Sequence, residues 1–347
     1  MKISVVIPVY NKEKYMDDLF QCLLSQTFEE FECILIDDGS TDDSPMICDE
    51  YAKKDDRIVT IHKQNGGTSD ARNVGLEKAS GVSHARNVGI DASCGEYITF
   101  IDADDRIPNN YLENLYETII ESGVDLSICT ITKIWHSGKK KKIQLPGSGT
   151  FDISELLLNF ADYQKKTGIY GYCCGKIILK ELVGNIRFDE RIKLAEDFDF
   201  FLKLYPKVSK ICFNDKTEYF YLQESENSSA MVKDSEIDYR TQLFINIRYK
   251  HFLEKENVYS GSNELIVSQL LSNYVIFSLL YCNIEKLKNC FEELQLICKS
   301  EGIKACGRNF FEKWILLLLY ENKYYLLKIS LQLRRLMRHL IRRLLRR

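Results

Sequence analysis

The first hundred residues alternate short apolar, β-branched runs with stretches of helical periodicity, and this alternation restricts the fold more than any other feature. The apolar runs are Ile3–Val9, Phe31–Ile36, Arg57–His62 and Tyr97–Ile101. Strands with near-continuous hydrophobicity belong to parallel sheets that are covered on both faces. The helical stretches Tyr15–Leu24 and Asp43–Lys53 supply that cover. We therefore predict a doubly wound α/β sheet in this part of the chain.

A polar cluster directly follows each of the four predicted strands. The clusters are Pro8-Val9-Tyr10-Asn11, Asp37-Asp38-Gly39-Ser40, Asn65-Gly66-Gly67 and Asp102-Ala103-Asp104-Asp105. Open α/β sheets bind ligands at the carboxyl ends of their strands. We therefore expect the four clusters to meet at one edge of the sheet and form a site.

Taken singly, each cluster allows two interpretations. Asp102 and Asp104 suit a hard divalent cation that completes its shell with a diphosphate, or they form an acidic turn. Asp38 accepts hydrogen bonds from a base or a ribose, or it belongs to an ordinary turn. Tyr10 packs on a nucleobase, or the segment ends the strand with Asn11 as a helix N-cap. The order of the clusters along the chain favours a nucleotide site.

Together with Ala85-Arg86-Asn87-Val88-Gly89 and Glu196-Asp197, the clusters resemble the motifs of family-2 glycosyltransferases, which have the GT-A fold. The resemblance covers residues 1–225 and is strongest to bacterial enzymes that build surface polysaccharides. It implies a Rossmann-like nucleotide-diphospho-sugar transferase sheet with a helical C-terminal extension. The residues implied to hold the uracil and ribose of a UDP-sugar are Pro8, Tyr10, Asn11 and Asp38. Asp102 is implied to contact the ribose and the metal, and Asp104 to ligate the Mn²⁺ or Mg²⁺ that bridges the diphosphate.

The same resemblance implies that Asp197 is the general base for the acceptor hydroxyl. Apolar neighbours raise the pKa of a carboxylate, which suits it to this role, and Phe198, Phe200 and Phe201 follow it closely. On the residues alone, an acid at the start of a helix is equally explained by the helix dipole.

Two positions depart from the pattern of the family. Ala195 stands where the family has Gly, and Gly175 stands where it has Asn. The lysine that follows, Lys176, either orients a loop that meets donor and acceptor or is an exposed structural side chain. The Gln-x-x-Arg-Trp box of processive synthases is missing from the sequence, so we expect the addition of a single sugar.

A tandem duplication lies inside the predicted site. Thr68–Gly81 and Val82–Gly95 are identical at seven of fourteen positions. One continuous helix would gain about 21 Å from the extra copy, so we expect one copy to loop out, with a break at Gly81. Arg86 of the second copy is then expected to face the donor diphosphate, with Arg72 of the first copy as its rival. If the extra copy blocks the donor pocket, the protein is an inactive relative that only binds a sugar nucleotide or a saccharide.

The rest of the chain carries two basic segments. Lys139–Lys142 lies in a Gly-flanked stretch that predicts a solvated hairpin tip, with contact to a phosphate as the alternative. Trp135, just before it, stacks on acceptor sugars or packs in the core. Residues 323–347 contain nine Lys and Arg and no acid, so the acidic excess of the chain lies before them. An acidic body is a poor partner for nucleic acid.

The basic tail has apolar residues at helical spacing, from Leu333 to Leu345. This pattern predicts an amphipathic helix on an anionic membrane surface, or one that packs its apolar stripe on the body. The twelve cysteines form no Cys-x-x-Cys pair and the N-terminus lacks the pattern of a signal peptide, so we expect free thiols in the cytoplasm. The predicted location is the inner face of the cell membrane, with peripheral attachment.

We therefore predict three parts: a glycosyltransferase domain over residues 1–225, a helical extension over 226–322 and a membrane-associating tail over 323–347. The expected activity is inverting, metal-dependent, non-processive transfer of one sugar from a UDP-sugar to a saccharide acceptor. A lipid carrier is expected to present that acceptor during synthesis of an exopolysaccharide, capsule or O-antigen. The alternatives are the inactive binding relative and a nucleotidyltransferase, although a nucleotidyltransferase would leave Asp197 without a role.

Overall fold

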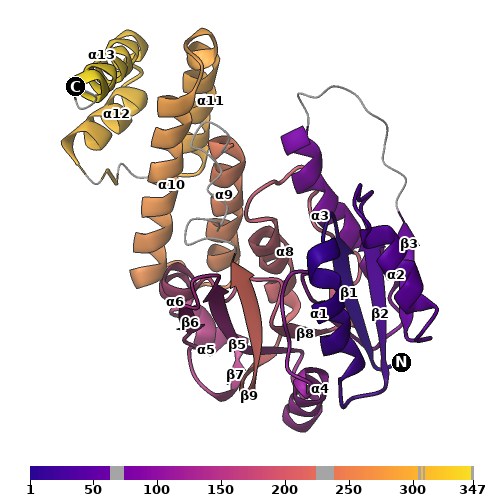
Figure 1. Ribbon diagram of the computed structural model, residues 1–347. Helices are drawn as coiled ribbons and strands as arrows, with labels where there is room; N and C mark the ends of the chain where they lie inside the picture. The colour runs from indigo at the N-terminus through magenta and orange to yellow at the C-terminus, as the bar shows by residue number, and fades with distance from the viewer. Residues whose placement is uncertain (63–73, 224–237, 304–305, 308, 345–347) are drawn as a thin grey trace. The chain divides into compact units, whose positions relative to one another are not determined.

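The computed structural model describes residues 1–62, 74–223, 238–303, 306–307 and 309–344. The chain divides into two compact units, Met1–Met231 and Val232–Arg347. The first unit is an α/β unit around one sheet, and the second contains only helices among its described residues (Figure 1).

The sheet of the first unit has a parallel half and a mixed half. Its strand order among the described residues is β3-β2-β1-β4-β8-β5-β9-β7, and β6 pairs with β5. The parallel half consists of β1 (Ile3–Val9), β2 (Phe31–Asp37), β3 (Ile58–His62) and β4 (Tyr97–Phe100). The mixed half consists of β5 (Leu126–Trp135), β6 (Lys140–Ile143), β7 (Gly149–Asp152), β8 (Lys176–Leu179) and β9 (Lys210–Gln223). The sequence predicted the parallel half, and β8 joins the two halves by pairing antiparallel with both β4 and β5.

Helices connect and cover these strands. They are α1 (Glu13–Leu24), α2 (Ser44–Ala52), α3 (Val74–Ala92), α4 (Tyr111–Ser122), α5 (Ile153–Leu157), α6 (Phe160–Thr167), α7 (Lys180–Val183) and α8 (Glu196–Leu204). Helix α3 packs on β1 and β2, and α2 packs on β2 and β3. Ile3, Val5 and Ile7 of β1 are fully buried, as is Val6, whose side chain points to the opposite face. Burial on both faces explains the near-continuous apolar runs of the sequence.

Helix α3 contradicts one expectation from the duplication. The helix begins at Val74 in the first copy and continues through Gly81 to Ala92, so the predicted break at Gly81 is wrong. A Cβ atom at Gly81 would lie 1.7 Å from Oδ2 of Asp38, and one at Gly89 would lie 2.3 Å from Cγ1 of Val6. These glycines therefore allow close packing of the helix on neighbouring elements and do not interrupt it. Residues 68–73, including Arg72, lie outside the described residues.

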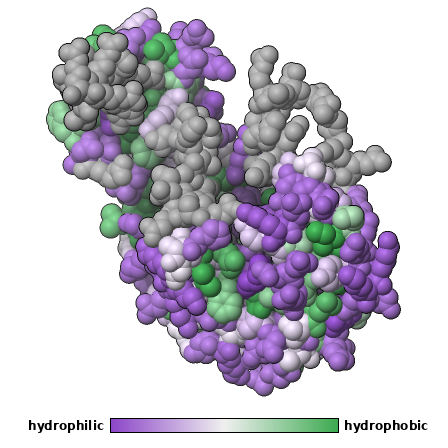
Figure 2. Space-filling model, in the orientation of Figure 1, coloured by the Kyte–Doolittle hydropathy of each residue, from purple (hydrophilic) through white to green (hydrophobic). Residues whose placement is uncertain are grey.

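The visible face of the first unit is largely hydrophilic, with apolar side chains in small separate patches (Figure 2). The second unit contains α9 (Tyr239–Lys255), α10 (Gly261–Tyr281), α11 (Leu287–Ser300), α12 (Phe310–Tyr320) and α13 (Tyr324–Leu344). Helix α10 is the one described helix that is long and apolar enough to cross a membrane, and 44% of the window that meets this test is buried in the structure. A core helix passes the same test.

Candidate active site

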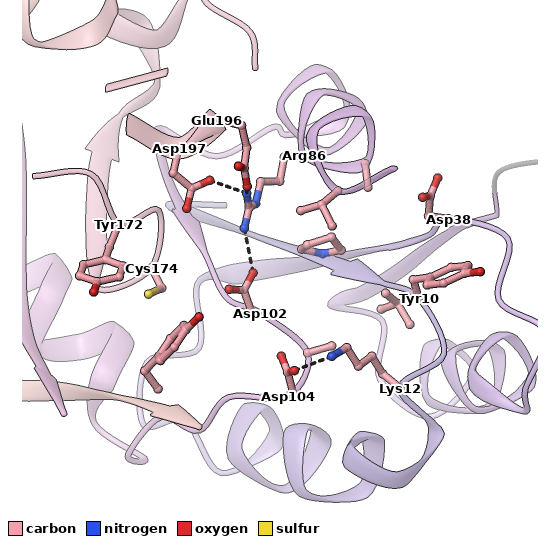
Figure 3. A pocket seen from close by; sticks show the side chains of 16 residues that line it. Tyr10, Lys12, Asp38, Arg86, Asp102, Asp104, Tyr172, Cys174, Glu196 and Asp197 are labelled. Atoms are coloured by element: carbon pink, nitrogen blue, oxygen red, sulfur yellow. Dashed lines mark hydrogen bonds and ion pairs between the residues drawn. The ribbon is translucent and has the colours of Figure 1, made fainter. Parts of the chain in front are cut away.

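The clusters that follow β1, β2 and β4 meet around one cavity of about 410 Å³ in the first unit (Figure 3). The fourth predicted cluster, Asn65-Gly66-Gly67, lies outside the described residues. Seven of the eight predicted site residues line it: Pro8, Tyr10, Asp38, Arg86, Asp102, Asp104 and Asp197. The eighth, Asn11, does not line the cavity. Its backbone N–H donates to Oγ of Ser40 (3.0 Å), and its side-chain oxygen accepts from the N–H of Thr41 (2.8 Å). Asn11 therefore ties the loop after β1 to the loop after β2.

Arg86 is the centre of an ion-pair cluster in this cavity. Its side chain is 4% exposed, and one nitrogen lies 2.5 Å from Oδ1 of Asp197 and 3.5 Å from Oε1 of Glu196. The other terminal nitrogen lies 3.0 Å from Oδ1 of Asp102. Burial acts to lower the pKa of Arg86, but the attraction of these carboxylates, Asp197 foremost, holds it well above its usual value. Arg86 thus joins the acid after β4 to the acids that open α8 (Figure 3).

Helix α8 carries two acids whose ionisation is perturbed. Burial raises the pKa of Asp197, Arg86 lowers it and Asp102 raises it, with a net upward shift. Burial and the charge of Asp197 together raise the pKa of Glu196 to about 7. The backbone N–H of Cys173 donates to Oδ2 of Asp197 (3.1 Å), which fixes the second oxygen of that carboxylate. The sequence singled out Asp197 but not Glu196, although Glu196 precedes it in the same motif.

The departures from the family pattern have a common backbone explanation. Gly175 has φ +71°, in the left-handed region that Gly and Asn both tolerate, so the replacement of Asn by Gly preserves the conformation. Ala195, the residue before α8, has φ +66°. An L-residue with a Cβ atom pays a steric cost of roughly 1 kcal/mol in this region, and Gly does not. Ala195 is therefore a strained position that orients the two acids of α8.

Lys176 is fully buried, so the interpretation of this residue as an exposed lysine is wrong. Its ammonium donates to the carbonyl oxygens of Ile169 (2.8 Å) and Tyr172, and it lies 4.5 Å from the centre of the Phe201 ring. Burial lowers the pKa of Lys176 to about 8. These bonds hold the segment that brings Tyr172 to the wall of the cavity.

The acids after β4 face the cavity in different ways. Asp104 is paired with the ammonium of Lys12, a residue that the sequence analysis missed, and its side chain is 29% exposed. Asp102 is equally exposed, whereas Asp105 is buried and accepts from the hydroxyl of Tyr219 (2.7 Å). Asp102 and Asp104 are therefore available to a ligand. Asp105 instead connects the loop after β4 to strand β9 through hydrogen bonds from Tyr219 and Leu222.

A divalent cation fits this pair of carboxylates only if other ligands complete its shell. The part of the chain that the structure describes contains no group of three or more His, Cys, Asp or Glu residues placed to hold a metal. Mg²⁺ and similar hard cations commonly bind one or two carboxylates and take their remaining oxygens from water and substrate phosphates. The contact between Asp104 and the Lys12 ammonium shows that this position attracts a cation. Asp102 and Asp104 fit a metal that is shared with a diphosphate.

A cavity at the carboxyl ends of parallel strands is the place where open α/β sheets bind their ligands, as the resemblance to GT-A glycosyltransferases implies for this chain. The family model described as "Glycosyl transferase family 2" matches residues 4–182, more than half of the chain. The chain belongs to this family.

Comparisons with individual proteins agree with this assignment. TarS of S. aureus (residues 1–349, in complex with UDP-GlcNAc) has a TM-score of 0.62 at 21% identity, over 96% of this chain and 92% of that chain. This similarity confirms the predicted fold. Minor teichoic acid biosynthesis protein GgaB of Bacillus subtilis is 33% identical over 66% of this chain and 24% of its own length. Glycosyltransferase GlyG of Streptococcus pneumoniae is 31% identical over 64% of this chain and 71% of its own length. The chain thus spans about a quarter of GgaB.

Proposed function

We propose that the protein transfers one sugar from a UDP-sugar to a saccharide acceptor during synthesis of a surface polysaccharide or a teichoic acid, with inversion at the anomeric carbon. The observation that carries this proposal is the joint placement of Asp102, Asp104, Arg86 and Asp197 around one cavity. The names of GgaB and the UDP-GlcNAc complex of TarS support the pathway class and the donor class, respectively.

The donor end of the cavity lies at β1 and β2. Tyr10 offers an aromatic surface to the uracil, and Asp38 offers carboxylate oxygens to the hydroxyls of the ribose. Pro8 completes this wall. Asn11 acts indirectly, because its two hydrogen bonds to Ser40 and Thr41 fix the distance between these loops.

Asp102 and Asp104 would hold a Mn²⁺ or Mg²⁺ ion together with the donor diphosphate. Such an ion supplies positive charge against the negative charge that grows on the leaving UDP. Lys12, which pairs with Asp104, and Arg86, which pairs with Asp102, carry further positive charge beside these two carboxylates. Lys12 would therefore lie beside the oxygens of a diphosphate held at Asp104.

Asp197 would accept the proton of the acceptor hydroxyl as the sugar is transferred. The Cys173 N–H and the Arg86 guanidinium each hold one oxygen of its carboxylate, so the side chain is oriented before the acceptor arrives. The net upward shift of its pKa, which burial causes and Arg86 limits, strengthens it as a base.

Turnover of a panel of UDP-sugars tests this function. UDP release is measured with Mn²⁺ and a mixture of saccharide acceptors, with and without EDTA, for the unmodified protein and for Asp104→Ala. We expect release that depends on both metal and acceptor, and a loss of at least about a hundredfold in the variant. Sugar transfer that is unaffected by EDTA and by Asp104→Ala would refute the metal-dependent mechanism. No turnover with any donor would instead favour a relative that only binds.

We also propose that α13 attaches the protein to the cytoplasmic face of the membrane, where a lipid carrier presents the acceptor. Leu327 and Leu331 are buried, and α13 packs on α11 and α12. The exposed apolar side chains of α13 include Ile329, Leu333, Leu336 and Met337, and the segment that follows is rich in Arg. This helix thus has one apolar stripe for the protein and another for a lipid surface.

Sedimentation with vesicles that contain phosphatidylglycerol tests the attachment. We expect Leu333→Ser/Leu336→Ser/Met337→Ser to reduce the bound fraction several-fold, since these side chains are exposed and their loss leaves the core intact. The matched control is Leu158→Ser/Leu265→Ser/Leu296→Ser, which removes three equally exposed apolar side chains elsewhere. Equal binding by both variants would refute a membrane role for α13.

A further inference from the structure

A second cavity of the first unit, of about 620 Å³, lies beside the hairpin of β5 and β6. Four lysines and two aromatic residues line it: Lys133, Lys141, Lys142, Lys166, Trp135 and Tyr163. The predicted hairpin is present, because β5 and β6 pair antiparallel, but its turn lies at residues 136–138. Lys140, Lys141 and Lys142 belong to β6, so the prediction that they form the tip is wrong. All four lysines of the run are exposed, and two of them, Lys141 and Lys142, also line this open cavity.

The charge in this cavity is unbalanced. No Asp or Glu is among the described residues that line it. Lys166 pairs with Asp162 (2.5 Å), one turn earlier in α6, whereas Lys133, Lys141 and Lys142 pair with no carboxylate in the described part of the chain. Lys133 and Lys141 are direct cross-strand partners. Like charges in that position destabilise a sheet, and an anion between them would remove the repulsion.

The neutral groups of the cavity add hydrogen-bond donors. Nε1 of Trp135 is buried and has no acceptor among the described residues. A buried donor without a partner is costly, typically by about 1–3 kcal/mol. The lysines that line the cavity offer donors alone, and the partner that suits them is rich in acceptor oxygens.

One lysine of this cavity, Lys133, lies close to two residues that line the donor cavity. The ammonium of Lys133 lies 5.3 Å from the centre of the Tyr172 ring and 5.7 Å from that of Tyr221. Both tyrosines line the cavity that contains Asp102 and Asp197. Lys133 and these two rings therefore lie between the lysine-lined cavity and the donor cavity.

We propose that this cavity binds a phosphate group of the acceptor, so that the enzyme selects phosphate-bearing saccharides or polyols over neutral ones. The role of the site in acceptor selection rests on the proposed transferase activity. The anion-binding site itself is inferred from the lysines of the cavity and the register of the hairpin. The phosphate belongs either to a phosphodiester within the acceptor chain or to a pyrophosphate at its lipid-linked end. Both present the same chemistry to the lysines.

Tryptophan fluorescence measures binding at this site without any requirement for turnover. The chain has two Trp residues, so Trp314→Phe leaves Trp135 as the only reporter. Three probes are titrated into this variant: a glycerol-phosphate oligomer with phosphodiester links, a disaccharide pyrophosphate with a short alkyl chain, and a neutral oligosaccharide. We expect a saturable change with one or both anionic probes and none with the neutral one. The probe that binds identifies the source of the phosphate.

Two charge variants in the same background test the lysines. Lys141→Gln/Lys142→Gln removes two charges that line the cavity, whereas Lys140→Gln/Lys165→Gln removes two neighbouring exposed charges that do not. We expect the Kd of the anionic probe to rise about tenfold or more in the first variant and to stay within about twofold in the second.

The outcomes separate this inference from the proposed function. A failure of both anionic probes to bind, equal binding of the neutral probe, or equal Kd values in the two variants would overturn the inference. If the anionic probe binds through Lys141 and Lys142 but no UDP-sugar is turned over, the phosphate site stands and the transferase proposal fails. If sugar transfer proceeds equally well to neutral and phosphate-bearing acceptors, the transferase proposal stands and the inference fails.

Discussion

The two cavities of the first unit present opposite arrangements of charge. Around Arg86, three carboxylates surround one buried cation, and Lys12 pairs with a fourth carboxylate, Asp104. Beside the hairpin, Lys133 and Lys141 face each other with no carboxylate among the described lining residues. Among the described residues, the carboxylates that line the first cavity (Asp38, Asp102, Asp104, Glu196 and Asp197) outnumber its cations (Lys12 and Arg86), so an anionic diphosphate needs a further cation to bind there. The second has unneutralised charge, so an anionic ligand binds without displacing a partner.

Among the substitutions considered, loss of the Arg86 cation should have the largest effect on stability and activity. Arg86→Met leaves Asp197, Glu196 and Asp102 without their shared partner. We expect a loss of roughly 3–5 kcal/mol in the free energy of unfolding and a loss of at least about a hundredfold in kcat. Urea denaturation and UDP release measure the two effects. If the variant unfolds like the unmodified protein, the ion pairs of Arg86 do not stabilise the folded state.

The pH dependence of stability tests the charge arrangement of the first cavity, because it depends on the ionisation of the acids of α8. The folded-state pKa of Glu196 is raised from 4.5 to about 7, so the folded protein binds the extra proton between these values. Its contribution to stability is therefore lost as pH rises from about 4.5 to about 7. We expect Glu196→Gln to increase stability at pH 8 relative to pH 5, by comparison with the unmodified protein. Chemical denaturation at both pH values checks this, and a gain that is larger at pH 5 would contradict it.

Substitution of Ala195, the strained residue before α8, should change the free energy of unfolding less than Arg86→Met does. Ala195→Gly removes the steric cost of a Cβ atom at φ +66°, and we expect a gain of about 1 kcal/mol in the free energy of unfolding. Ala195→Val should lose at least as much. A thermal denaturation series measures both changes. Stability that falls in the glycine variant would mean that the left-handed conformation is not under strain.

Removal of the extra copy should have the smallest effect. Deletion of Thr68–Gly81 joins Gly67 to Val82, so a glycine still precedes the second copy, as Gly81 now does beside Asp38. The second copy supplies Arg86 and the helix that packs on β1 and β2. We expect kcat/KM within about threefold of the original value. A large gain in activity would show that the extra copy obstructs the donor cavity, and a large loss would show that the first copy contributes to it.

The sequence allowed prediction of features that depend on local pattern. The four strands and the acids that follow them come from runs of neighbouring residues, and they led correctly to the placement of Asp38, Asp102 and Asp104 on one cavity. Arg86 could be preferred over Arg72 because the second copy keeps its spacing to β4. The same reasoning failed at Gly81, where the glycine serves close packing against Asp38 and not a break in the helix.

Features that depend on contacts between distant segments could not be predicted. The pairing of Lys12 with Asp104 requires the loops after β1 and β4 to meet, and 92 positions separate the two residues. Lys176 is buried because β8 enters the sheet between β4 and β5, which no local pattern shows. The lysine-lined cavity depends on the register of the hairpin, which places Lys133 opposite Lys141. In each case the tertiary structure, rather than residue type, determines the role.

The most direct test of the proposed reaction is the comparison of donor binding and sugar transfer in Asp197→Asn. The substitution keeps the size of the side chain and removes its ability to accept a proton. With Mn²⁺, a UDP-sugar that the unmodified protein uses and its acceptor, we predict a donor Kd within about threefold of the original and a transfer rate reduced by about a thousandfold. Transfer at an undiminished rate would contradict the assignment of Asp197 as the general base and with it the central claim.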